Sequence, residues 1–427
     1  MSAPSFRELT LASLRIGLLG FGGPAGQIAL MHRVFVEEKR WIDEPRYLHA
    51  LNFCMLLPGP EAQQLATYVG WLLHGVRGGL VAGALFVLPG ALVVFGLSWL
   101  YAAFGQTVWL AAAFVGVKAA VVALVAEAMW KIGKRALKDW GDAVLAGAAF
   151  AALALFGLPF PLVVLAAAIY GALFVRRPPP EATAAPPVQP RAWRALVAAV
   201  VWGVVWLAPV GAAFLLLGPD HLLTDIGQTF STLAVVTFGG AYAVLAYLQQ
   251  QAVETHGWLT TAQMIDGLGL AETTPGPLIL VNQYVGFMAG WGQGGLPLAA
   301  AAAALATWAT FAPSWMFIFA GAPYAEALRR SRLASGALAA ITAAVLGVIA
   351  NLALWFALHV LFAEGADVFL PWGHRLFIPD ATSFQWLPAL LAVVAAVALL
   401  RFKVNVLVVV LACALAGAAP LLLGGPA

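Results

Sequence analysis

Two Pro-Gly-Pro sequences, at residues 58–60 and 275–277, interrupt apolar runs in which a membrane helix would otherwise be expected. Proline has no backbone N–H and its ring clashes with the preceding turn, while glycine frees the backbone angles. Each helix must therefore break. A helix that restarts at Pro60 directs its first N–H groups and its positive dipole end into the break.

Irregular backbone of this kind persists at membrane depth only inside protein or beside a water-filled cavity. Two breaks in matching places of two halves are the sequence pattern that points to the substrate site of a transporter. The sequence therefore predicts that the two breaks face each other near the middle of the membrane.

Composition agrees with a membrane protein that crosses the bilayer many times. Of the 427 residues, 63% are hydrophobic and 10% are charged, whereas a soluble protein carries about a quarter charged residues. Cys54 and Cys413 are far apart in apolar runs, so neither a disulfide framework nor a zinc site is supported. The first ten residues lack the cleavage pattern of a secretory signal. We expect a multi-pass protein of the bacterial inner membrane, with the lipid bilayer as its partner, no nucleic acid and no cofactor.

The predicted fold class is all-α, with about thirteen apolar segments of roughly the 20 residues that span a bilayer. They cover residues 10–31, 47–73, 79–104, 108–130, two short segments hinged at 158–161, then 193–217, 227–249, 260–291, 296–321, 335–362, and two more hinged at 401–403. Residues 176–191 are predicted to form an extended Pro/Ala-rich linker. Residues 363–383 are predicted to form an external loop.

The two halves of the chain repeat each other. Phe21-Gly22-Gly23 matches Phe238-Gly239-Gly240 at an offset of 238 − 21 = 217, and the two Pro-Gly-Pro sequences have the same offset. Tyr68 then matches Tyr284 at 216, and Pro89 matches Pro313 at 224. We therefore predict two six-segment repeats, residues 1–175 and 227–427, joined by a linker and one helix in residues 176–226. The single connecting helix inverts the second repeat.

The placement of basic residues supports this inversion. With the N-terminus inside, the internal loops and the start of the chain hold 16 of the 22 Lys and Arg residues. This is the positive-inside pattern. A re-entrant path for either broken segment would reverse several of these loops, so we expect each broken segment to cross the membrane once.

At these motifs the sequence resembles the chromate ion transporters in their long, two-domain form. The resemblance is carried by Phe21-Gly22-Gly23-Pro24, by Leu57-Pro58-Gly59-Pro60-Glu61-Ala62 followed by Gln64-Leu65-Ala66-Thr67-Tyr68, and by Thr273-Thr274-Pro275-Gly276-Pro277-Leu278. It implies secondary export of chromate, driven by the membrane potential or a proton gradient, with sulfate as a look-alike ligand.

The sign of the ligand also follows from the breaks, because facing helix starts hold an anion through backbone N–H groups and the helix dipole. Neutral side chains near the breaks are further donors, or else hydrogen-bond between helices. The predicted substrate-binding residues are Gly22, Gly23, Pro58, Gly59, Pro60, Glu61, Gln64, Thr67, Lys118, Gly239, Gly240, Thr273, Thr274, Pro275, Gly276, Pro277 and Asn282.

Two charged candidates occur in the first half only, since Glu61 aligns with Leu278 and Lys118 with Thr342. Lys118 lies mid-segment, where a charge is costly and marks function by default. It either attracts the anion or pairs with Glu127 or Glu61. Glu61 either takes part in proton coupling or caps the first turn of its helix.

The Gly-Gly pairs at residues 22–23 and 239–240 are expected to allow close helix packing, with direct binding as the second interpretation. Other functional classes find less support. An anion channel predicts a pore-lining ring, an intramembrane enzyme predicts a catalytic pair, and neither pattern is evident. No nucleotide-binding loop is present, so ATP is not expected to drive transport directly. Sulfate or another oxyanion remains an alternative substrate, and the sequence leaves the oligomeric state open, a homodimer included.

Overall fold

The computed structural model describes residues 4–21, 23–105, 107–175, 192–238, 241–324 and 331–422. The predicted linker at 176–191 and three predicted binding residues, Gly22, Gly239 and Gly240, lie outside this part of the chain. The chain divides into two compact units, and each unit draws on both halves of the sequence.

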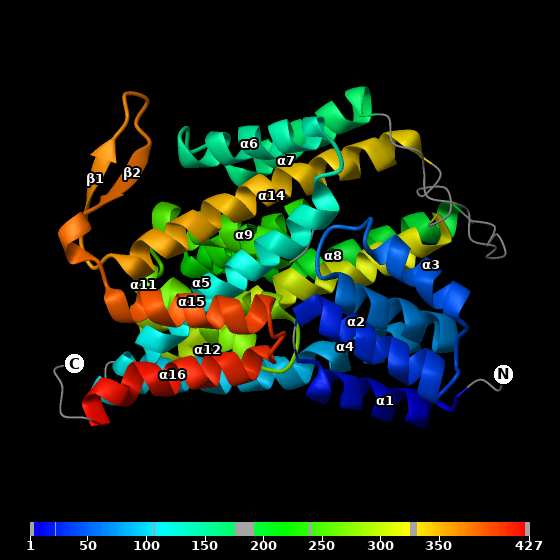
Figure 1. Cartoon of the computed structure of the whole chain (residues 1–427). Helices are drawn as coiled ribbons and strands as arrows, with labels where there is room; N and C mark the ends of the chain where they lie inside the picture. The colour runs from blue at the N-terminus through cyan, green and yellow to red at the C-terminus, as the bar shows by residue number, and fades with distance from the viewer. Residues whose placement is uncertain are drawn as a thin grey trace. The chain divides into compact units, whose positions relative to one another are not determined.

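Unit 1 comprises Met1–Ser98, Arg176–Ala241 and Thr274–Ser335. Within it, α12 packs against α8 and α9. Its elements are α1 (Phe6–Leu19), α2 (Gly23–His32), the π-helical turn η1 (Arg33–Glu38), α3 (Glu44–Cys54), α4 (Glu61–Phe104, up to Ser98), α8 (Ala192–Leu217), α9 (Leu222–Val236), the short helix η3 (Leu278–Leu280), α12 (Val281–Gly321) and η4 (Ala322–Tyr324) (Figure 1).

Unit 2 comprises Trp99–Val175, Tyr242–Thr273 and Gly336–Ala427. Within it, α5 packs against α11, α15 and α16. Its elements are α5 (Val108–Ala136), α6 (Trp140–Ala154), α7 (Phe160–Phe174), α10 (Ala241–Gln249), the π-helical turn η2 (Gln250–Thr255), α11 (Thr261–Thr273), α14 (Arg332–Leu361), the strands β1 (Gly365–Phe369) and β2 (Arg375–Pro379), η5 (Ala381–Ser383), α15 (Trp386–Leu400) and α16 (Val406–Leu422).

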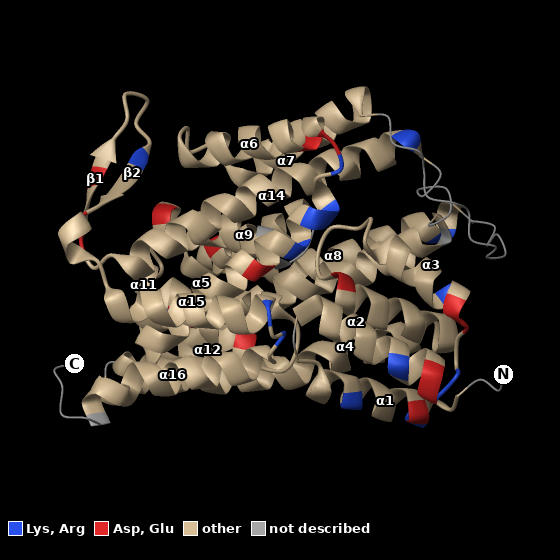
Figure 2. Cartoon of the chain, viewed as in Figure 1, with Lys and Arg blue, Asp and Glu red and all other residues tan. Residues whose placement is uncertain are grey.

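Five helical stretches of the described chain are long and apolar enough to cross a membrane, and five shorter apolar helices accompany them. The helices α12, α15 and α16 contain no Asp, Glu, Lys or Arg, and Figure 2 shows the tan ribbon of α16. The chain is therefore a predominantly helical membrane protein, as its composition predicts. The count of thirteen segments remains a prediction.

The longest helices are not straight. The 44 residues of α4 would extend about 66 Å at 1.5 Å per residue, whereas the hydrocarbon core of a bilayer is about 30 Å thick. The backbone leaves helical geometry at His74 and at Gly75, where φ is +61°. There the helix folds back on itself, and a Cβ on Gly78 would overlap the carbonyl oxygen of Gly70.

The helix α12 turns in the same way at Gly294 and Gly295, where φ at Gly295 is +64°. Only glycine adopts such a conformation without strain, so these residues set the two turns. Other elements also recur: η1 and η2 begin at Arg33 and Gln250, which are 250 − 33 = 217 residues apart. The inversion of the second repeat remains a prediction.

The two segments that carry the Gly-Gly motifs are also discontinuous, which the sequence did not predict. The first breaks between α1 and α2, and the other between α9 and α10. The expected close packing is wrong for Gly23, since a Cβ there would meet nothing within 4 Å. Gly23 instead supplies a φ of +70°, which a residue with a side chain rarely adopts.

The predicted external loop at 363–383 contains the two strands of the described chain, so the prediction of an all-α chain is corrected there. β1 and β2 form an antiparallel hairpin in which Phe369 pairs with Arg375. The Arg375 guanidinium also forms an ion pair with Asp367, and this hydrogen-bonded carboxylate raises the pKa of Arg375.

Small residues let the helices of unit 2 approach closely. A Cβ on Gly116 of α5 would overlap the carbonyl oxygen of Cys413 in α16. A Cβ on Gly347 of α14 would likewise overlap the carbonyl oxygen of Ala146 in α6. Close backbone approach is a typical source of helix association where the surrounding lipid removes the hydrophobic driving force.

Replacing Gly116 with alanine is therefore expected to destabilise the packing of α16 on α5 by about 1–3 kcal/mol, a typical cost of overpacking. The matched control is Gly147→Ala in α6, where a Cβ would meet nothing within 4 Å and alanine favours the helix. Thermal unfolding in detergent measures both variants. Equal stability of the two would contradict the close contact.

Candidate functional site

Both Pro-Gly-Pro breaks lie in unit 1, and hydrogen bonds fix each of them to the opposite half of the sequence. The N–H of Gly59 donates to the carbonyl of Thr237 at 2.9 Å, and the N–H of Gly276 donates to the carbonyl of Gly20 at 3.0 Å. The acceptors are related by the repeat offset, 237 − 20 = 217, as are the donors, 276 − 59 = 217. The two bonds are thus reciprocal across the repeat.

The conformation of the breaks depends on their glycines. Gly59 has a φ of +103° and Gly276 a φ of +98°, values that side-chain-bearing residues rarely adopt. Space also requires glycine at the second break, because a Cβ on Gly90 of α4 would overlap the carbonyl oxygen of Pro275. The second break therefore lies directly against α4.

Two buried glutamines satisfy the carbonyl groups of the breaks. Gln64 Nε2 donates to the carbonyl of Pro58 at 2.6 Å. Gln27 Nε2 donates to the carbonyls of Gly276 at 2.6 Å and Gly20 at 3.1 Å. Unpaired backbone groups are expensive to bury, so these amides make the irregular backbone tolerable.

A small cavity lies where the breaks meet. Its volume of about 20 Å³ has room for roughly one water molecule. The lining residues are Pro24, Gln27, Gly59, Pro60, Glu61, Ala62, Thr237, Pro277, Leu278 and Ile279. The start of α4 forms one wall, and the first N–H groups of a helix have no partner within it. In this conformation the cavity is smaller than an ion with four oxygens.

The structure divides the predicted binding residues into groups. One group belongs to the two breaks and the cavity that both of them line, which together are the joined breaks. Its members are Pro58, Gly59, Pro60, Glu61, Gln64, Pro275, Gly276 and Pro277. Asn282 and Thr273 have other partners: Asn282 Nδ2 donates to Thr310 Oγ1 at 3.0 Å, and Thr273 Oγ1 donates to the carbonyl of Leu270 at 2.8 Å. Thr274 is buried.

Lys118 lies in unit 2 and has a partner that the sequence did not suggest. Its Nζ is 3.6 Å from Asp266 Oδ1, and the hydroxyl of Tyr101 donates to Asp266 Oδ2 at 2.8 Å. The expected pairing with Glu127 or Glu61 is corrected, since Glu127 pairs with Lys131 at 2.6 Å. Asp266 is buried, with 5% of its surface exposed.

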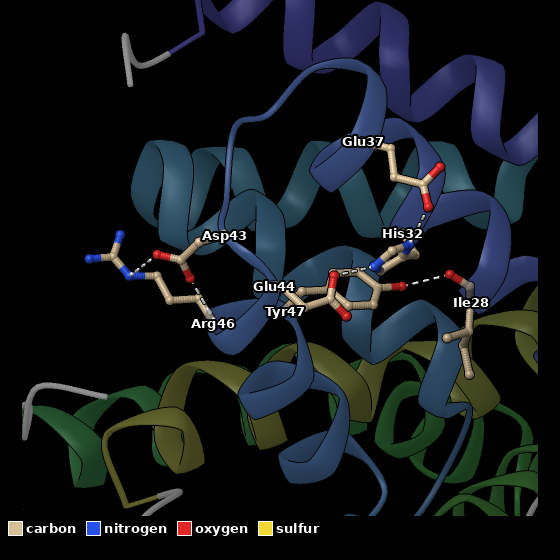
Figure 3. A network of polar contacts seen from close by, with 7 residues as sticks. All are labelled: Ile28, His32, Glu37, Asp43, Glu44, Arg46 and Tyr47. Carbon is tan, nitrogen blue, oxygen red and sulfur yellow. Dashed lines mark hydrogen bonds and ion pairs between the residues drawn. The ribbon is translucent and has the colours of Figure 1, made fainter. Parts of the chain in front are cut away.

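The polar patch between α2 and α3 is an organised network in unit 1. His32 contacts Glu37 at 3.2 Å and Glu44 at 2.5 Å (Figure 3). The hydroxyl of Tyr47 donates to the carbonyl of Ile28 at 2.6 Å. These contacts tie α3 back onto α2, the helix that supplies Gln27 to the cavity.

Sequence reasoning missed Gln27 and Thr237. The sequence does offer a way to find Gln27, because it is a single amide side chain in an apolar run and a buried amide needs a hydrogen-bond partner. Thr237 contributes a backbone carbonyl, which no side-chain pattern reveals.

Replacing Lys118 with methionine is expected to destabilise unit 2, because Asp266 would keep a buried carboxylate without its ammonium partner. Breaking a buried pair costs about 3–5 kcal/mol, and we expect about 3 kcal/mol or less because the Lys118 side chain is 25% exposed. The double variant with Asp266→Asn should recover most of the loss. Thermal unfolding of the purified variants tests this, and an unaffected single variant would contradict it.

Comparison with known proteins identifies the family. The family profile described as "Chromate transporter" matches residues 7–172 and 224–418. The chain is 33% identical to a "Chromate transport protein" of Pseudomonas aeruginosa over 97% of this chain and 92% of the relative. It is 30% identical to a "Chromate transport protein" of Cupriavidus metallidurans over 94% of this chain and 90% of the relative.

A shorter relative aligns with only part of the chain. It is an uncharacterised transporter of Bacillus subtilis, YwrB, which is 32% identical over 36% of this chain and 77% of its own length. No solved structure matches the chain. The profile match across both halves, at the motifs that form the joined breaks, shows that the chain belongs to the chromate transporter family, whose members are transporters and not enzymes.

Proposed function

We propose that the chain is a secondary transporter that exports chromate across the bacterial inner membrane, driven by the membrane potential or a proton gradient. The observation that carries the proposal is the pair of reciprocal hydrogen bonds in unit 1, each of which fixes one break to the opposite half of the sequence. Discontinuous helices joined across a repeat are the usual setting of a transporter's substrate site. Two relatives that share most of the chain are named for chromate transport.

The binding of a tetrahedral dianion at the breaks follows from the chemistry of their walls. The start of α4 directs N–H groups and the positive end of its dipole toward the cavity. The small cavity must widen to admit the ion, and the reciprocal bonds of Gly59 and Gly276 are the contacts that widening would break. Substrate entry and separation of the breaks are thus one event.

Glu61 is the residue through which proton binding would be coupled to anion binding at this site. Glu61 is one of the residues that line the cavity, in the first turn of α4, and a charged carboxylate there would repel a dianion. A proton on Glu61 removes that repulsion, so proton binding and anion binding are linked. Sulfate has the same shape and charge as chromate, and the transport assay below separates the two.

Transport assays in inverted membrane vesicles test the function. Vesicles with the wild-type protein should accumulate labelled chromate when a membrane potential or pH gradient is imposed, because export from the cell is uptake into such vesicles. Excess unlabelled sulfate should compete only if both ions are substrates. Absence of chromate uptake under every gradient would refute the proposal.

Leucine at Gly59 or Gly276 is expected to abolish this uptake, since a side chain at these φ values costs about 1–3 kcal/mol of backbone strain and blocks the joined breaks. The matched control is Gly96→Leu in α4, where a Cβ would meet nothing within 4 Å. All three variants should reach the membrane in equal amounts. Full uptake by both break variants would show that the breaks are structural kinks and do not bind the substrate.

The inverted arrangement of the halves predicts the side on which each loop lies. Single cysteines at Lys134, Lys403 and Arg330, the last outside the described residues, should react only from inside. A cysteine at Ala366 in β1 should react from outside. Labelling of intact cells with an impermeant maleimide makes the distinction, and external labelling at Arg330 would rule out the inversion.

A further inference from the structure

Three buried polar side chains of unit 1 converge beside Gly83 without hydrogen-bond partners in the described part of the chain. Gln63 and Thr67 lie on the first half of α4, and both are 0% exposed. The third is Trp315 of α12, whose indole Nε1 is buried although the ring is partly exposed. Gln63 Nε2, Thr67 Oγ1 and Trp315 Nε1 have no partner among the described residues.

Gly83 shows how closely these atoms approach one another. A Cβ built on Gly83 would overlap Thr67 Oγ1, and it would lie 2.8 Å from Trp315 Nε1 and 3.4 Å from Gln63 Nε2. The three polar atoms therefore surround one point, which any side chain at residue 83 would fill.

The chemistry of the three groups indicates what belongs there. An indole N–H only donates, a carboxamide nitrogen only donates, and a hydroxyl is able to donate. A buried donor without an acceptor is costly. The carboxamide oxygen of Gln63 is buried without a partner among the described residues too, so it accepts from none of the three donors. The missing partner is an oxygen acceptor, either an oxyanion oxygen or a water molecule.

The location favours the oxyanion. Gln63 and Thr67 follow Glu61 by two and six residues on the same helix, which is about 3 and 9 Å along its axis. Gln63 and Thr67, four residues apart, share one face of α4, and Glu61, two residues before Gln63, lies on the opposite face. The cluster is therefore close to the end of α4 that lines the cavity, on another side of the helix. Three neutral donors there bind an anion without a fixed positive charge, as buried oxyanion sites often do.

The equivalent place in the second half is already satisfied. Thr67 aligns with Gln283 at the offset of 216, and Trp315 with Ala91 at 224. Gln283 Nε2 donates to the carbonyl of Ala91 at 2.9 Å, so its donor is used within the protein. Of the two places that the repeat relates, only the one beside Gly83 therefore combines these unpaired donors.

We propose that Gln63, Thr67 and Trp315 form an oxyanion-binding site beside Gly83, a second station for the transported ion next to the joined breaks. This inference rests on the proposed function, since it assigns the ligand from the oxyanion class that the transporter carries. It makes Trp315 a specificity-determining residue that no sequence motif indicates.

The test uses substitutions that remove one donor and keep the shape, Trp315→Phe and Thr67→Val. We expect either variant to raise the KM for chromate roughly tenfold or more, the effect of losing a hydrogen bond to a charged ligand. Without ligand, each purified variant should melt at or above the wild-type temperature, because an unsatisfied donor has been removed. Gly83→Ala should fill the site and raise the KM as well.

Matched controls are available on α12. The indole of Trp308 donates to the carbonyl of Trp206 at 3.0 Å, and the hydroxyl of Thr307 donates to the carbonyl of Ala303 at 2.8 Å. Trp308→Phe and Thr307→Val remove donors that have protein acceptors. They should lower the melting temperature and leave the KM for chromate unchanged.

The second readout is the rise in melting temperature on adding potassium chromate, compared with potassium chloride at equal ionic strength. Wild-type protein should be stabilised and both donor variants should lose most of this effect. An unchanged KM and unchanged stabilisation in both would overturn the proposal. The proposal would also be overturned if both donor variants melted below the wild-type protein by the same amount with and without chromate. That result would identify a buried water molecule as the partner of the donors. Failure of the wild-type protein to bind or transport chromate would instead refute the proposed function.

Discussion

The hydrogen-bonding requirement of the backbone at the two breaks is the constraint on which the architecture of unit 1 depends. A broken helix inside a membrane protein leaves N–H and C=O groups that lipid cannot satisfy. Here the N–H of each break glycine donates to a carbonyl in the opposite half, and two buried glutamines cover break carbonyls. The chain therefore pairs the discontinuity of one half with that of the other, and neither break is satisfied alone.

This pairing explains why unit 1 draws on both halves of the sequence. A repeat that satisfied its own break would pack as a separate domain. Because the acceptors Gly20 and Thr237 lie just before the Gly-Gly motifs, those segments must also leave the helical conformation there. In the described part of unit 1 these two segments are thus discontinuous as well as the two Pro-Gly-Pro segments, and Gly23 serves backbone conformation.

Charge is distributed differently in the two units. In unit 2 the ammonium of Lys118 faces the Asp266 carboxylate, which also accepts a hydrogen bond from Tyr101. In unit 1 the site contains neutral donors and one carboxylate, Glu61. An anion site built from neutral donors holds its ligand without a permanent positive charge, which suits a transporter that must also release it. The partner of Lys118 lies within unit 2, and a role of Lys118 in anion binding stays a prediction.

The sequence by itself determined the membrane class, the family and the position of the breaks, because composition, Pro-Gly-Pro and the repeat offset are local properties of the chain. The hinges at Pro159 and Arg401 are local too, and α7 and α16 begin after them. What only the tertiary structure decided are the partners: Asp266 for Lys118, Thr237 for Gly59, and the meeting of Trp315 with Gln63 and Thr67. Partners come from residues far apart in the chain, and hydrophobic periodicity and spacing do not encode which buried polar groups will meet. The β-hairpin and the folding back of α4 at Gly75 were missed for a related reason, since a single glycine or a short exposed loop carries little pattern until its neighbours are in place.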